Sequence, residues 1–82
     1  MENNIKITFW INRTKKNSKN LVPIYLRVAQ NNDFFTRATG IRISAGDWDK
    51  KAMRIKGATQ EVITTNATLD SIKVKVFQAV NQ

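Results

Sequence analysis

The first part of the chain alternates between apolar and polar positions. In residues 5–12 (IKITFWIN) every second residue is a large apolar one, and in residues 23–30 (PIYLRVAQ) the same alternation places Ile24, Leu26 and Val28 on one side. A period of two is typical of a strand with one face buried. Pro23 suits the start of a strand, where a missing N–H is tolerated. The pattern predicts two strands over these ranges, joined by the polar and basic loop of residues 13–20.

A hairpin is expected next, because Asn31, Asn32 and Asp33 follow the second strand. Asn and Asp tolerate left-handed backbone conformations and favour tight turns. We predict a third strand over residues 34–43, antiparallel to the second.

The facing of this third strand depends on a bulge. Ile41 and Ile43 have the character of core residues, yet they share their parity with the charged Arg37. One extra residue near Gly40 would form a β-bulge and reverse the facing of the strand. Under this hypothesis Ile41 and Ile43 point toward the core. The residues expected to point away from it are Phe35, Arg37 and Thr39.

Residues 44–57 (SAGDWDKKAMRIKG) combine turn-forming and basic residues, and we predict an irregular, basic turn there. Ser44 can cap a short turn, and Asp47 and Asp49 can accept backbone N–H groups there. Trp48, between the two acids, is expected to close the edge of a small core. The acids would then shape the path of the chain and take no part in chemistry.

The remaining residues, about 60–80, predict one helix. Thr59 is a suitable N-cap, and Glu61 would lie in the first turn. Residues 72–76 also alternate as a strand would, but the length without a turn signal favours a helix. The expected core stripe is Val62, Asn66, Leu69, Ile72, Val76 and Val80, widened by Ile63, Ala67 and Phe77. The chain is thus predicted to be a single α+β domain over residues 1–82: a three-stranded antiparallel sheet packed on one face by a C-terminal helix.

The net charge of the chain indicates what kind of partner it binds. The 82 residues contain 14 Lys and Arg against six Asp and Glu, which gives a formal net charge of +8. A balance this basic points first to a polyanionic partner, with nucleic acid as the default. A membrane surface would need a basic amphipathic helix with bulky apolar anchors, and none is evident.

The predicted sheet face away from the helix has the composition of a nucleic-acid contact. It combines cations, hydroxyls and aromatic rings without any acid, and Arg and Thr can contact guanine edges and thymine methyl groups. The alternative is that its aromatic side chains complete the core or meet a neighbouring domain. The sheet-face candidates are Lys6, Thr8, Trp10, Tyr25, Arg27, Phe35, Arg37 and Thr39. The candidates for phosphate binding are Arg13, Lys15, Lys16 and Lys19 in the first loop, and Lys50, Lys51, Arg54 and Lys56 after Trp48.

Catalysis is disfavoured by what the chain lacks. It has no histidine and no cysteine, and its closest acid pair, Asp47 and Asp49, has no third ligand nearby in sequence. No phosphate-binding loop, nucleophile elbow or dinucleotide signature occurs. We expect no catalytic residue, no metal and no cofactor. With neither a signal peptide nor an apolar run of membrane-spanning length, we expect a soluble protein of the cytoplasm, associated with the bacterial nucleoid when bound.

The order of several short motifs resembles the N-terminal arm-type DNA-binding domain of tyrosine recombinases, the integrases of phages and conjugative transposons. The resemblance covers nearly the whole chain. It rests on residues 23–27 (PIYLR), 39–41 (TGI), 47–49 (DWD) and the basic run that ends at Lys56 and Gly57.

This resemblance implies a function and a parent protein. It implies that the sheet enters the major groove of double-stranded DNA at arm-type sites of a mobile element, with Arg27 and Arg37 as contacts. Full-length recombinases carry their catalytic tyrosine, arginines and histidines in a separate domain, so the chain would be a non-catalytic fragment. Other integrase protomers and accessory DNA-bending proteins would be its further partners.

Two other functions remain open. A basic RNA-binding or ribosome-associated module could use Trp10, Tyr25 and Phe35 to stack on unpaired bases. A protein-interaction domain could use the same face, with the charge incidental. Preference for duplex DNA over single-stranded RNA, and the dependence of binding on salt and sequence, separate the three hypotheses.

Overall fold

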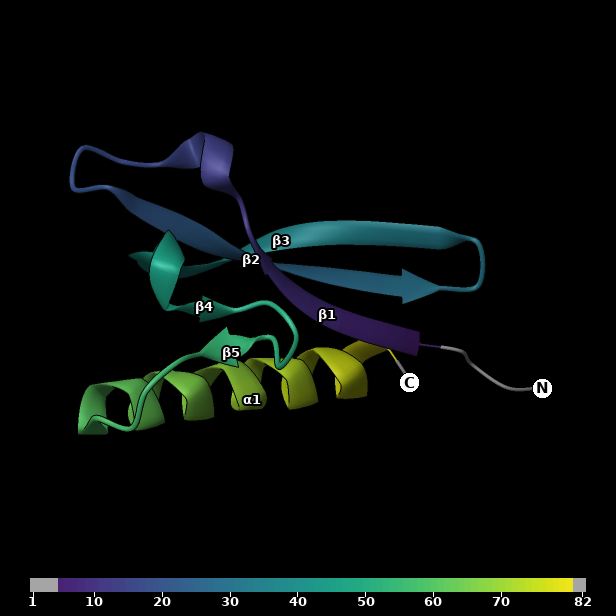
Figure 1. Ribbon diagram of the computed structural model, residues 1–82. Helices are drawn as coiled ribbons and strands as arrows, with labels where there is room; N and C mark the ends of the chain where they lie inside the picture. The colour runs from purple at the N-terminus through teal and green to yellow at the C-terminus, as the bar shows by residue number, and fades with distance from the viewer. Residues whose placement is uncertain (1–4, 81–82) are drawn as a thin grey trace.

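The computed structural model describes residues 5–80 and has the predicted order of three strands and a helix (Figure 1). Two short strands that the sequence did not predict lie between the sheet and the helix. The strands are β1 (Ile5–Ile11), β2 (Leu21–Gln30), β3 (Asp33–Ser44), β4 (Trp48–Asp49) and β5 (Arg54–Ile55), and the helix is α1 (Gln60–Val80). Short 3-10 turns cover Arg13–Lys15 and Ala45–Asp47. The predicted α+β class is confirmed.

The main sheet is antiparallel, with β2 in the centre and β1 and β3 at the edges. A two-residue loop joins β2 to β3, and its first residue, Asn31, has a φ of 56°. Asn is among the few residues other than glycine that adopt this left-handed conformation readily. The local sequence therefore fixes the position of the hairpin.

A bulge interrupts the pairing of β2 with β3 near Gly40, as predicted. Four residue steps separate Ala38 from Arg42 in β3, whereas two steps separate their partners Tyr25 and Pro23 in β2. β3 therefore carries two extra residues here. Gly40 takes up the distortion with a φ of 84°, which a side chain would strain.

Because two residues are inserted, the bulge does not reverse the facing of β3. Phe35 pairs with Val28 and Arg37 with Leu26, and both partners belong to the helix-facing side of the sheet. The expectation that Phe35 and Arg37 lie on the face away from the helix is wrong. An insertion of one residue changes the parity of a strand, and an insertion of two restores it.

One core lies between the sheet, the β4–β5 hairpin and α1. Trp48 is buried in it, so its predicted role at the edge of the core is confirmed. The clustered buried residues are Ile7, Phe9, Ile24, Leu26, Val28, Trp48, Ile55 and Leu69. The hairpin thus supplies part of the core and is fixed by it.

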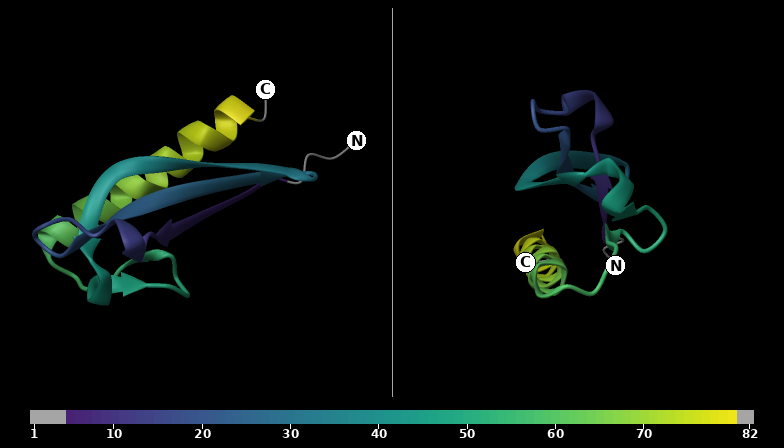
Figure 2. Two further views of the ribbon diagram at one scale, coloured as in Figure 1. Left: turned by 90° about the horizontal axis from the view of Figure 1, so that it is seen from above. Right: turned by 60° about the vertical axis from the view of Figure 1, so that its left-hand side comes forward.

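Thr59 caps α1, since its hydroxyl accepts the Val62 N–H at 3.2 Å. The predicted stripe packs as expected: Asn66 and Leu69 are buried, and the others are half-buried. Ile63, Ala67 and Phe77 do not widen the core. Ile63 is 54% exposed and Phe77 43%. In the left view of Figure 2, α1 crosses obliquely to the β2–β3 hairpin, so the narrow sheet covers only one stripe of the helix.

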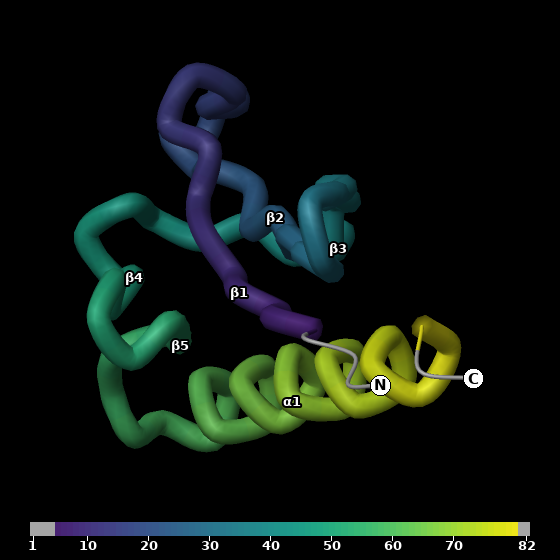
Figure 3. Tube along the Cα trace, turned by 90° about the vertical axis from the view of Figure 1, so that its right-hand side faces the viewer, coloured from purple at the N-terminus to yellow at the C-terminus, as the bar shows by residue number. Residues whose placement is uncertain are grey.

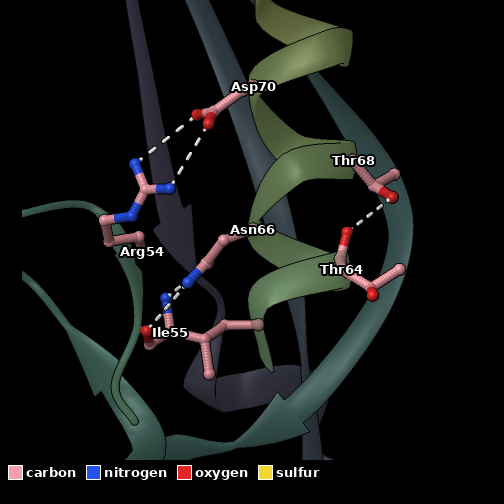
Figure 4. A network of polar contacts seen from close by, with 6 residues as sticks. All are labelled: Arg54, Ile55, Thr64, Asn66, Thr68 and Asp70. Carbon is pink, nitrogen blue, oxygen red and sulfur yellow. Dashed lines mark hydrogen bonds and ion pairs between the residues drawn. The ribbon is translucent and has the colours of Figure 1, made fainter. Parts of the chain in front are cut away.

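Polar contacts join α1 to β5 (Figure 4). The Asn66 side chain accepts from the Ile55 N–H at 2.9 Å and donates to the Ile55 carbonyl at 3.0 Å. One helical turn further along, Asp70 forms an exposed ion pair with Arg54 at 3.3 Å. Among the described residues, no helix has an apolar stretch of the length that a bilayer span requires.

Candidate nucleic-acid interface

The face of the main sheet turned away from α1 is here called the open face. Strand pairing arranges its residues in three rows that run across β1, β2 and β3, because directly paired residues point to the same side. The rows are Lys6–Ala29–Phe34, Thr8–Arg27–Thr36 and Trp10–Tyr25–Ala38. None of these nine residues is acidic, and two of them, Lys6 in the first row and Arg27 in the second, are cations.

The corrected facing of β3 changes which residues belong to this face. Lys6, Thr8, Trp10, Tyr25 and Arg27 lie on it as predicted. Phe34, Thr36 and Ala38 take the places that were expected for Phe35, Arg37 and Thr39. The Thr39 hydroxyl lies within the bulge, where it donates to the Ile24 carbonyl at 2.8 Å and accepts the Ile41 N–H at 3.2 Å.

Arg27 is held against an aromatic ring. Its guanidinium carbon lies 4.3 Å from the centroid of the Phe34 ring, within the range of a cation–π contact. Phe34 is 61% exposed, so the pair stands on the surface of the open face. On the helix-facing side, Arg37 lies over Phe35 at the longer distance of 5.7 Å.

A second aromatic group lies at the other end of the open face. The rings of Trp10 and Tyr25 are tilted against each other with centroids 5.1 Å apart, and Lys15 Nζ lies 5.7 Å from the Tyr25 centroid. Such contacts fix the rings and bring one loop cation to the border of the sheet.

The loop that follows β1 carries the first basic cluster and is well fixed. Asn17 Oδ1 accepts the N–H groups of Lys19 and Leu21, at 3.0 and 2.9 Å. Arg42, on β3, donates to the carbonyls of Lys15 and Leu21, at 3.1 and 3.5 Å. The loop stands on the side of the sheet opposite α1, as Figures 1 and 3 show. Its exposed cations are Arg13, Lys15, Lys16 and Lys19.

The β4–β5 hairpin carries the second basic cluster, and Asp49 shapes it. One carboxylate oxygen of Asp49 accepts the N–H groups of Lys51 and Ala52, both at 3.0 Å. Asp47 contributes its backbone carbonyl, which accepts the Lys56 N–H at 2.8 Å. Ser44 precedes the 3-10 turn at the N-cap position, but its side chain makes no capping bond. The structural role predicted for the acids holds for the Asp49 side chain.

Lys50 connects this hairpin to the open face. It lines a shallow surface hollow together with Thr8, Trp10, Arg27 and Thr36. Lys51 and Lys56 are exposed, whereas Arg54 is engaged with Asp70. The two basic clusters therefore flank the open face, with Lys15 and Lys50 nearest to it.

Phe34, Thr36 and Ala38 of the open face, and Arg42 beside it, were not predicted. Phe34 and Thr36 could have been found by continuing the strict alternation back from Ile41 and Ile43. Arg42 pairs with Pro23 and fixes the basic loop, but no local signal in the sequence indicates that contact. Within residues 5–80, no group of three or more His, Cys, Asp or Glu side chains could hold a metal ion.

A small antiparallel sheet, backed by one helix and cationic on its open face, defines a nucleic-acid-binding module. Residues 9–82 match the arm DNA-binding domain family. The chain therefore belongs to this family, the N-terminal arm-type domains of tyrosine recombinases, and the predicted membership is confirmed. Membership in this family supports DNA binding, and an arm DNA-binding domain is non-catalytic. No curated protein and no solved structure shows significant similarity to the chain.

Proposed function

We propose that the domain binds double-stranded DNA sequence-specifically, with the open face laid into the major groove at arm-type sites of a mobile element. The observation that carries the proposal is the open face itself. Its nine residues include two cations, two threonines and three aromatic side chains, and no acid. Three strands at about 4.8 Å spacing span about 10 Å, which suits a major groove about 12 Å wide.

The two basic clusters would contact the phosphate backbone on either side of the groove. Phosphate contacts supply affinity and orientation, while contacts to base edges supply the sequence preference. In this arrangement Lys15 and Lys50 lie where the open face ends, so they are the first candidates for phosphate contact.

The parent protein would be a tyrosine recombinase of a phage or conjugative transposon, acting in DNA integration and recombination. The domain would hold it on arm-type sites while a separate catalytic domain exchanges strands. Other protomers and accessory DNA-bending proteins would bind the same DNA, in the cytoplasm at the nucleoid.

The experiment that tests the proposal is an NMR titration of the isotope-labelled domain with a mixed library of short duplexes, with single-stranded RNA in parallel. The two tryptophans serve as probes, because Trp10 lies on the open face and Trp48 in the core. We expect duplex DNA to shift the signals of Trp10, Arg27 and Thr36 more than those of Trp48 and Arg37.

Two outcomes would contradict the proposal. Shifts confined to the loops that carry Lys15 and Lys50 would indicate charge attraction alone and leave the open face to a protein partner. Stronger shifts of Trp10 with RNA than with duplex DNA would favour stacking on unpaired bases.

A further inference from the structure

Arg27 occupies the centre of the open face. It lies on the central strand, in the middle row, directly between Thr8 of β1 and Thr36 of β3. Neither neighbour can neutralise its charge, and no ion pair of Arg27 occurs among residues 5–80. A guanidinium that no carboxylate engages keeps its donors for a ligand.

Phe34 restricts where this guanidinium can lie. The two residues come from adjacent strands and from neighbouring rows, and the guanidinium carbon is 4.3 Å from the ring centroid. Arg27 is exposed, and contact of the ring with one side of the guanidinium leaves the N–H donors in its plane free to reach a ligand. An arginine oriented before binding loses less side-chain entropy when its hydrogen bonds form.

We infer that Arg27 reads a guanine through its O6 and N7 atoms and that Phe34 is the positioning residue that orients Arg27 for this contact. The inference rests on the proposed binding of duplex DNA. Two parallel N–H donors match the two acceptors that guanine presents in the major groove, and no other base presents both there. Thr8 and Thr36, on either side, supply methyl groups and hydroxyls for the neighbouring base pairs.

The helix-facing side of the sheet offers a matched control. Arg37 and Phe35 form a similar pair, at 5.7 Å, on the face that the DNA would not contact. Replacement of either arginine by alanine removes one positive charge from the hairpin. A difference between R27A and R37A therefore reports the contact and not the net charge.

The test begins with selection of a preferred duplex from a random library by the wild-type domain. Each guanine of that duplex is then replaced by 7-deazaguanine, which lacks the N7 acceptor and still pairs with cytosine. We expect one position at which this change weakens wild-type binding about 10-fold. R27A should weaken binding to the selected duplex about 5- to 150-fold and should no longer respond at that position. R37A should keep the response.

The role of Phe34 is tested by a double-mutant cycle. F34L should weaken specific binding about 2- to 5-fold in the wild-type background and have no effect in R27A. F34Y, which keeps the ring, should restore binding. Equal effects of F34L in both backgrounds would overturn the positioning role.

If a motif is selected but no guanine responds, or if R27A still responds, the reading role of Arg27 fails while the proposed function stands. If the library yields no motif at all, the proposed function itself fails.

Discussion

The side chain of Asn66 bonds to both backbone polar groups of Ile55, at 2.9 Å to the N–H and 3.0 Å to the carbonyl. Asn66 and Ile55 are both buried, so water cannot replace these bonds readily. They tie α1 to β5 and thereby hold the hairpin that carries Lys50 and Lys51. This backbone contact explains why a polar residue, Asn66, occupies a buried position in the apolar stripe of α1.

Replacing Asn66 with Leu should destabilise the fold strongly. Leu has a similar size, but it leaves the N–H and carbonyl of Ile55 buried without partners, and each such group costs about 1–3 kcal/mol. We expect the free energy of unfolding to fall by roughly 2–4 kcal/mol, measured by urea denaturation. The control is D70N, which removes the exposed ion pair with Arg54 and should cost less than about 1 kcal/mol. A larger loss in D70N than in N66L would contradict this account of the helix contact.

The two acids beside Trp48 should differ in importance. Asp49→Ala removes the acceptor of two backbone N–H groups, a loss comparable to that of a helix cap, so we expect about 0.5–2 kcal/mol of destabilisation. Asp47→Ala should change stability by less than about 0.5 kcal/mol, because the Asp47 side chain is exposed and its backbone carbonyl remains. Both variants gain the same net charge, so thermal denaturation of the pair isolates the effect of the turn. Equal stabilities would mean that the Asp49 contacts do not support the hairpin.

The bulge of β3 allows a test with one substitution at two positions. Thr39→Val should lower stability by about 1–2 kcal/mol, because it removes the hydroxyl that bonds to Ile24 and Ile41. Thr36→Val, on the open face, should leave stability nearly unchanged and alter DNA sequence preference instead. Denaturation and duplex selection on both variants give the comparison. A change of sequence preference in T39V without loss of stability would mean that the assigned facing is wrong.

Local pattern was enough to predict most of the fold. Two strands and the helix follow from their periods, the hairpin from Asn31, and the helix start from Thr59. Trp48 and the stripe through Leu69 were placed correctly because burial of large apolar side chains dominates in a small domain. The five candidates of the open face on β1 and β2 were placed correctly for the same reason.

Two kinds of feature could not be predicted from the sequence. One is the number of residues inserted at the β3 bulge, and the other is contacts between residues far apart in the chain. The size of the bulge decides whether Arg37 or Thr36 lies on the open face, and no local signal distinguishes one inserted residue from two. The β4–β5 hairpin is stabilised by Trp48 packing and by Asn66, which lies 11 residues from Ile55. Exposure of Ile63 and Phe77 follows from the narrowness of the sheet and the oblique path of α1, which are properties of the assembled fold.

The contribution of the β4–β5 hairpin to DNA binding can be separated from that of general charge. Lys50 lines the hollow on the open face, whereas Lys75 is exposed on α1, on the other side of the sheet. If Lys50 contacts a phosphate, Lys50→Ala should weaken binding to specific and scrambled duplexes alike. It should also reduce the slope of log K against log[salt] by about 0.9. Lys75→Ala removes the same charge and should leave the slope unchanged.

Fluorescence anisotropy at several salt concentrations measures both the binding constant and its dependence on salt. Equal slopes for the two variants would exclude a direct phosphate contact by Lys50, and a loss confined to the specific duplex would make Lys50 a base-reading residue instead.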